Sequence, residues 1–191
     1  LTAIDPNLVE GVDFSIAFYG GALLARLSAA VAPQLDDPTL VDLWRINRRM
    51  WIVMDSDRGD GELKPAVQRL QAQIRDAQTG GTWVTSGYTI ENYVDADVLE
   101  SAVRAVHPSV ARLKRTSTDQ DPLKRFVRDD GKPATRLDKV TIALEVCKQP
   151  ANLDVMDLRQ RVAEVARFIR ETPDPVVPPL AAAVPGAESP E

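Results

Sequence analysis

A short apolar run that ends abruptly in two carboxylates is the feature that most limits how this chain can fold. Residues 51–54 (Trp-Ile-Val-Met) are uncharged, and Asp55 and Asp57 follow them directly. Side chains two residues apart on a strand face the same side. Both carboxylates can therefore point together off the end of a buried strand. Such paired oxygen ligands suit a hard divalent cation, Mg²⁺ or Mn²⁺.

Apolar periodicity indicates strands that alternate with helices along the chain. The expected strands are 14–19, 49–54 and 82–85, and the expected helices are 22–31, 63–77, 94–106, 139–148 and 154–170, with irregular structure over 109–136. This alternation predicts an α/β fold, a parallel sheet flanked by helices. Ligands of such sheets bind at the carboxyl ends of the strands. Gly20-Gly21, the two aspartates and residues 86–88 follow three predicted strands, so we expect them to converge on one rim.

The composition excludes several kinds of protein. The 191 residues are 44% hydrophobic and 27% charged, as in a globular protein. With a single cysteine, Cys147, and a single histidine, His107, neither a disulfide within the chain nor a Cys/His zinc cluster can form. No run approaches the roughly 18 apolar residues of a membrane span, and the first residues lack the pattern of a signal peptide. A cytoplasmic protein without a membrane partner is the simplest interpretation.

Charge is distributed unevenly. The net charge of −5 argues against a general nucleic-acid coat. The segment 107–139, however, carries nine Lys/Arg and five Asp, so it is +4 and the remainder is −9. Such a distribution suits an enzyme that holds a metal at one place and a polyanion at another, although a solvated loop is equally compatible with the pattern. The residues expected to contact DNA phosphates are Arg112, Lys114, Arg115, Lys124 and Arg125.

Three parts of the chain differ in character. Residues 1–106 carry the predicted strands and the paired aspartates, and residues 107–171 combine the basic segment with the last two helices. Residues 172–191 contain six prolines and no aromatic residue. Because such a segment buries too little apolar surface to offset its ordering entropy, we expect a disordered tail.

Four sequence elements together resemble a known family. In order they are Gly20-Gly21 after a strand, the Asp-Ser-Asp at 55–57, the Glu-Asn-Tyr at 91–93, and the Asp-Lys-Val at 138–140. They are similar to the TOPRIM nuclease domain of the OLD (overcoming lysogenization defect) family of ATP-dependent endonucleases. The resemblance covers about residues 8–170. It implies a TOPRIM-like parallel sheet followed by a helical C-terminal part.

The resemblance also implies a chemistry, the two-metal hydrolysis of DNA phosphodiesters. It makes Asp55, Asp57 and Glu91 ligands of Mg²⁺ or Mn²⁺, with Glu91 assisting catalysis. Lys139 matches a lysine that stabilises the charge developing on the phosphate. One metal can lower the pKa of the attacking water while the other steadies the leaving oxygen.

The chain departs from the family pattern at its front. TOPRIM domains begin with a Glu-Gly motif, which Glu10-Gly11 with Asp13 superficially matches. Only nine residues separate Glu10 from Gly20, fewer than the dozen or so that a crossover between parallel strands needs. The phosphate loop of the family's ATPase half is absent too. We therefore expect this chain to be part of a longer protein that includes an ATPase domain.

Other interpretations stay open from sequence. The chain fits a catalytically incomplete TOPRIM fragment that only binds metal or a partner. It also fits a primase- or topoisomerase-like TOPRIM, which in the topoisomerase case needs a tyrosine such as Tyr19, Tyr88 or Tyr93 and a separate breakage domain. The aspartates can equally begin a turn, and the sequence leaves a homodimer open.

Overall fold

A parallel pair of strands organises the N-terminal half of the chain. The computed structural model describes residues 1–19, 27–28, 41–42, 49–58, 61–77, 80–113 and 120–171. Strand β3 (Met50–Met54) pairs in parallel with β4 (Gly80–Val84), and helix α2 (Pro65–Ala77) connects them. A second parallel pair, β1 (Leu27–Ser28) with β2 (Val41–Asp42), is two residues long. The described residues thus have a mixed α/β structure.

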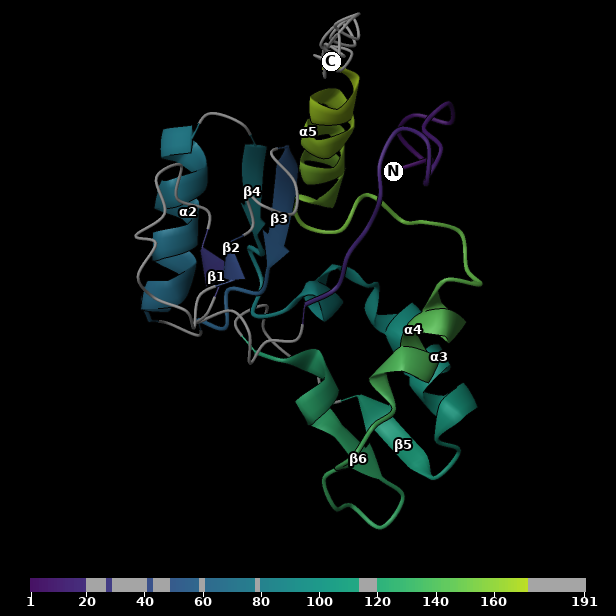
Figure 1. Ribbon diagram of the computed structural model, residues 1–191. Coiled ribbons are helices and arrows are strands. Elements are labelled where there is room, and N and C mark those ends of the chain that lie inside the picture. The colour runs from purple at the N-terminus through teal and green to yellow at the C-terminus, as the bar shows by residue number, and fades with distance from the viewer. Residues whose placement is uncertain are drawn as a thin grey trace, which may run out of the picture.

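Helices cover both faces of the β3–β4 pair (Figure 1). On one face, Met54 packs with Val67, Leu70 and Ile74, the buried stripe of α2. On the other face lies α5 (Leu158–Arg170), where the ring of Phe168 is 5.3 Å from that of Trp51. Alternate residues of a strand point to opposite faces, which explains how β3 serves both helices.

Glycine at the start of β4 is required by this packing. A Cβ built on Gly81 would overlap the indole ring of Trp51, which lies across the strand. Glycine at position 81 therefore leaves room for the ring of Trp51, which contacts Phe168 of α5.

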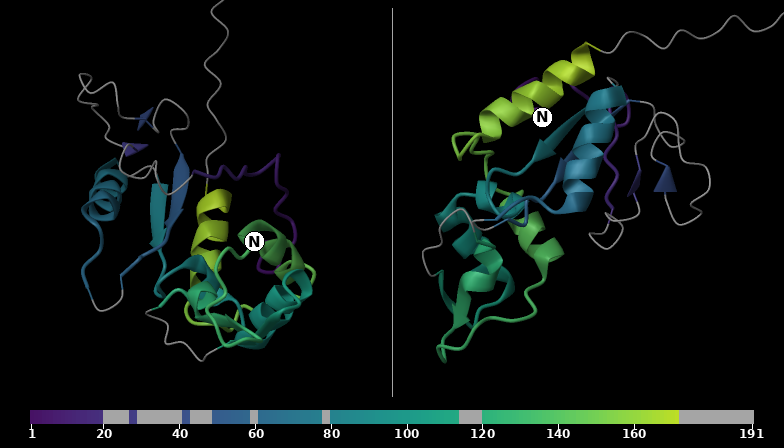
Figure 2. Two further views of the ribbon diagram at one scale, coloured as in Figure 1. Left: turned by 90° about the horizontal axis from the view of Figure 1, so that it is seen from below. Right: turned by 90° about the vertical axis from the view of Figure 1, so that its left-hand side faces the viewer.

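A second hydrophobic core is built from the C-terminal elements. Helix α3 (Ala96–Val106) packs against α4 (Lys139–Val146) and against the antiparallel hairpin of β5 (Val110–Leu113) and β6 (Phe126–Arg128). Phe126 is fully buried, and Leu123 of the 3-10 helix η3 (Pro122–Arg125) adds to the same cluster. The elements around this core form a second lobe, which lies beyond the carboxyl ends of β3 and β4 (Figure 1 and the right-hand view of Figure 2). The rim of the sheet therefore faces the second core.

The structure confirms most of the predicted elements and corrects three of them. Strands β3 and β4 and helices α2 to α5 lie within a few residues of their predicted positions. The strand predicted at 14–19 is wrong: Phe14 makes only an isolated bridge with Glu10, and Phe18 is 93% exposed. The irregular structure predicted over 109–136 is also wrong, since this segment contains the β5–β6 hairpin.

Several expectations fall where the structure gives no description. Gly20-Gly21, the tail 172–191 and most of the predicted helix 22–31 lie outside the described residues. Within that predicted helix only residues 27–28 are described, and they form strand β1, so the helix prediction is wrong at these two residues.

Candidate active site at the ends of the parallel strands

The loops that follow β3 and β4 are hydrogen-bonded to each other. The amide of Thr85 donates to the carbonyl of Met54 (3.0 Å), so the pairing continues one residue beyond the strands. The fully buried Ser56 donates from its hydroxyl to the carbonyl of Gly87 (2.7 Å), and its amide donates to Thr85 Oγ1 (2.9 Å). This network fixes the residue between the two aspartates, and with it the directions of Asp55 and Asp57.

Both aspartates are held at the rim. Asp55 Oδ1 accepts a hydrogen bond from the backbone amide of Ile90 (2.8 Å). Asp57 has φ +48°, in the left-handed region that aspartate tolerates better than most residues, and its amide donates to the carbonyl of Tyr88 (2.9 Å). The carboxylate of Asp57 pairs with Lys64 Nζ at 2.5 Å.

The 3-10 helix η2 (Ile90–Tyr93) brings Glu91 to the same rim. Asn92 fixes the turn, because its Oδ1 accepts from the amide of Thr89 (2.8 Å) and its Nδ2 donates to the carbonyl of Gln120 (3.0 Å). Glu91 Oε1 accepts from Lys139 Nζ at 2.9 Å, across 48 residues of sequence. The expected site residues Asp55, Asp57, Glu91 and Lys139 thus lie around one rim.

Lys139 is positioned by the start of α4. Asp138 is the N-cap of that helix and accepts from the amide of Thr141 (3.0 Å). The amide of Asp138 donates to Nε2 of His107, the C-cap of α3 (3.0 Å). His107, which has no catalytic pattern in the sequence, therefore ties the end of α3 to the residue before Lys139.

The carboxylates at the rim influence one another. Partial burial raises the pKa of Asp55 above its ordinary value of 3.8, and the charges of Glu91 and Asp57 raise it further against the opposing bond from Ile90. Burial also raises the pKa of Glu91, but the hydrogen bonds from Lys139, Thr89 and its own backbone, with the charge of Lys139, together outweigh burial and the net pKa is lowered. Burial lowers the pKa of Lys139, yet the hydrogen bond and charge of Glu91, with the charges of Asp121 and Asp55, together outweigh burial and the net pKa is raised. Of Asp55 and Glu91, Asp55 is thus the one whose burial is not outweighed by favourable bonds and charges.

This asymmetry predicts that Asp55→Asn stabilises the protein at neutral pH. Because the folded-state pKa of Asp55 is raised, ionisation of Asp55 costs stability as the pH rises through that pKa, and the cost is absent below the unfolded value. Asparagine removes the charge and keeps an oxygen for the Ile90 amide. The side chain is at the surface, so we expect a gain of at most about 1 kcal/mol in the free energy of unfolding.

Urea unfolding measures this gain, with Asp129→Asn in the turn after β6 as the control. The difference between Asp55→Asn and wild type should shrink as the pH is lowered to about 3.5. A variant that is less stable than wild type at pH 7 would contradict the assignment.

The expected DNA-contacting residues divide into two groups. Lys124 and Arg125 lie on η3, which packs beside η2, so they are close to the element that carries Glu91. The side chain of Lys124 is 76% exposed, and Arg125 is hydrogen-bonded to Gln120. Arg112 is in β5, where only the backbone is described, and Lys114 and Arg115 lie outside the described residues.

A second network beside the rim was missed by the sequence analysis. The hydroxyl of Tyr93 donates to Asp157 Oδ1 (2.6 Å) and accepts from the amide of Ser86 (3.0 Å). Asp157 also accepts from Ser86 Oγ (2.8 Å) and from Arg161 Nε (2.9 Å). This network ties the start of α5 to the loop after β4. No sequence pattern joins residues 86, 93 and 157, so spacing alone does not reveal it.

The carboxylates fit a divalent cation in their chemistry, although two of them are paired with lysines. Asp55, Asp57 and Glu91 supply the oxygen ligands that Mg²⁺ prefers, and the charges of Glu91 and Asp57 add to the effect of burial, the main cause of the raised pKa of Asp55. In the described part of the chain, no three His, Cys, Asp or Glu side chains are already gathered around one point. A cation that Asp55 shares with Asp57 or Glu91 would therefore compete with Lys64 or Lys139 for those carboxylates.

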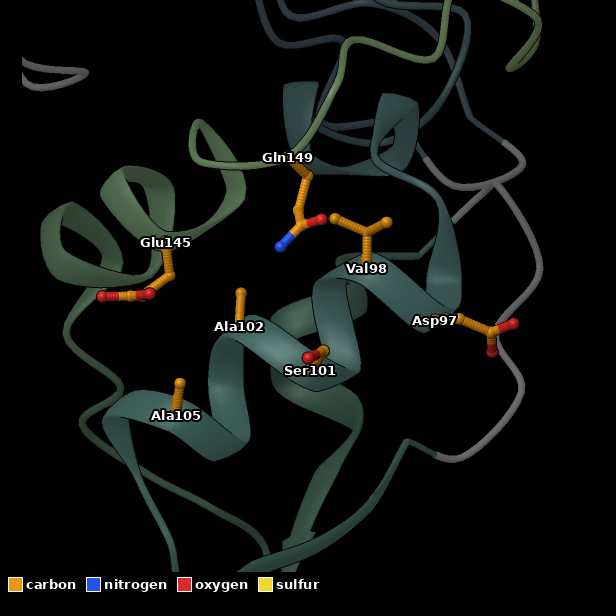
Figure 3. A pocket seen from close by; sticks show the side chains of 7 residues that line it. All are labelled: Asp97, Val98, Ser101, Ala102, Ala105, Glu145 and Gln149. Carbon is orange, nitrogen blue, oxygen red and sulfur yellow. The ribbon is translucent and has the colours of Figure 1, made fainter.

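A shallow pocket elsewhere in the second lobe is a weaker candidate site. It encloses about 270 Å³ between α3 and α4 and is lined by Asp97, Val98, Ser101, Ala102, Ala105, Glu145 and Gln149 (Figure 3). Figure 3 shows Asp97 and Glu145 at opposite ends of the pocket rather than pointing at a common centre. Ligand sites require polar groups that converge on one point, and this pocket lacks that convergence.

Comparison with known proteins adds no identity. No protein-family model, no curated protein and no solved structure matches the chain. Among the described helices, none combines the length and the apolar character that crossing a membrane would need.

Proposed function

We propose that this chain is a metal-dependent DNA endonuclease, the nuclease portion of an OLD-type protein with a TOPRIM fold. The observation that carries the proposal is the meeting of Asp55, Asp57, Glu91 and Lys139 at the carboxyl ends of two parallel strands. Ligands of parallel sheets bind at this position. These four residues lie in three of the four sequence elements that carry the family resemblance.

The proposed roles follow from charge and position. Asp55 and Asp57, with Glu91 beside them, would hold Mg²⁺ or Mn²⁺. The cation, when bound, would act as a Lewis acid on a phosphate oxygen and lower the pKa of a bound water. Lys139 would place its ammonium group against the phosphate, and the exposed Lys124 would contact the DNA backbone from η3.

Lys139→Met is expected to slow cleavage about a hundredfold without weakening metal binding. Loss of one donor aimed at developing charge costs about 10²- to 10³-fold in known enzymes, and Lys139 donates no ligand to the metal. Lys148→Met is the matched control, because Lys148 follows the same helix and forms an exposed pair with Glu145 at 2.5 Å. Equal loss of cleavage in both variants would contradict a specific role for Lys139.

Incubation of supercoiled plasmid with the purified chain tests the function itself. We expect nicked or linear DNA in Mg²⁺ or Mn²⁺ and intact plasmid in EDTA. Cleavage that persists in EDTA would rule out the metal-dependent chemistry.

A second candidate function is the binding of metal or a partner without cleavage. The pairing of Asp57 and Glu91 with lysines favours it, since both acids are neutralised in this structure. Metal binding without cleavage would support this candidate over the nuclease.

A further inference from the structure

Lys64 is a cation of the rim that the family resemblance does not include. Its ammonium group lies 2.5 Å from Asp57 Oδ2, and Asp55 and Tyr88 also act on it electrostatically. The backbone of Lys64 is fixed at the start of α2, where its carbonyl accepts from the amides of Val67 (2.9 Å) and Gln68 (3.1 Å). The side chain therefore reaches back over the rim from a rigid element.

The two lysines flank Asp55 from different elements. Lys139 lies on α4 and forms an ion pair with Glu91, while Lys64 precedes α2 and forms an ion pair with Asp57. Asp55 itself, among the described residues, forms no ion pair and accepts a single backbone hydrogen bond from Ile90. The rim thus holds three carboxylates and two ammonium groups, a nearly balanced set in the absence of a metal ion.

We propose that Lys64 is a displaceable counter-ion of this site: it occupies Asp57 when no metal is bound, and it contacts a substrate phosphate once a divalent cation takes that carboxylate. This inference rests on the proposed function. Replacement of Lys64 by a divalent cation on Asp57 breaks only a partly exposed ion pair, in which the Lys64 side chain is 56% exposed and that of Asp57 32% exposed. Exposed pairs of this kind contribute little stability, and a divalent cation attracts the carboxylate more strongly than an ammonium group does.

The proposal predicts opposite effects of Lys64→Met on two ligands. Mn²⁺ affinity should rise about two- to fivefold, because the cation no longer competes with an ammonium group. Binding to DNA in Mg²⁺ should lose about one unit from the slope of log K against log salt, since one phosphate contact is lost. In EDTA the two slopes should be equal, because Lys64 then remains on Asp57.

Isothermal titration with Mn²⁺ and salt-dependent binding to a phosphorothioate duplex, which resists hydrolysis, measure these effects. Lys148→Met is the control, because it removes a pair of the same 2.5 Å length and similar exposure away from the rim. Both changes in Lys64→Met, and neither in the control, would support the proposal. Unchanged Mn²⁺ affinity, or a slope lowered equally in EDTA, would overturn it while the nuclease proposal survives. A wild-type chain that binds no Mn²⁺ would overturn both.

Discussion

Asp55→Asn is expected to lower metal-dependent DNA cleavage about a thousandfold or more. A catalytic metal contributes several kcal/mol of charge stabilisation, and each 1.36 kcal/mol corresponds to a factor of ten in rate. Asparagine matches aspartate in shape and keeps an oxygen for the amide of Ile90, which now bonds to Asp55 Oδ1 at 2.8 Å. The loop therefore keeps its structure while the metal loses a charged ligand.

Two features make this substitution informative. The raised pKa of Asp55 predicts a variant at least as stable as wild type at pH 7, so unfolding cannot explain lost activity. Asp129→Asn, which removes a carboxylate from the turn after β6, controls for the change in net charge. Wild-type cleavage rates in Asp55→Asn, measured on plasmid at saturating Mg²⁺, would contradict the proposed metal site.

Phe126→Ala is expected to destabilise the protein by about 3–5 kcal/mol. Phe126 is fully buried in the second core, among Leu99, Val103, Leu123 and Ile142. Truncation of such a side chain loses its transfer free energy and leaves a cavity. Domains of this size are stable by only about 5–15 kcal/mol, so the variant should be close to unfolding at room temperature.

The same core supports the rim, which links this prediction to function. Ile142 of α4 and Leu123 of η3 both belong to it, and these elements carry Lys139 and Lys124. Leu144→Ala is the control, because Leu144 lies on α4 and is 61% exposed. Its truncation should lower the free energy of unfolding by less than about 0.5 kcal/mol. Urea unfolding compares the two, and equal midpoints would contradict the assigned core.

Local patterns in the sequence predicted helices α2 to α5 and strands β3 and β4 well. The apolar stripe of α2 and the run before Asp55 reflect burial by neighbouring elements, which periodicity records. The β5–β6 hairpin was missed because β6 is three residues long and only Phe126 marks it as buried. The strand predicted at 14–19 has apolar residues without a described partner strand, and Phe18 is exposed instead.

The candidate site was only partly accessible from sequence. The strand-end position of Asp55 and Asp57 follows from the strand that precedes them, and the structure bears out that strand. The pairing of Lys139 with Glu91 spans 48 residues and depends on how the second core meets the rim. Lys64 carries no pattern of its own, since a lysine before a helix is ordinarily solvated. Its closeness to Asp57 emerges only from the fold.

Paramagnetic broadening of backbone amide signals by Mn²⁺ tests most directly whether these residues form one cation site. The account predicts that signals of Ser56, Asp57, Ile90 and Glu91 disappear first, at Mn²⁺ below one equivalent, and that they persist in Asp55→Asn. Broadening that spares these residues and begins instead at other acids, such as Asp129 and Asp130, would contradict the central claim.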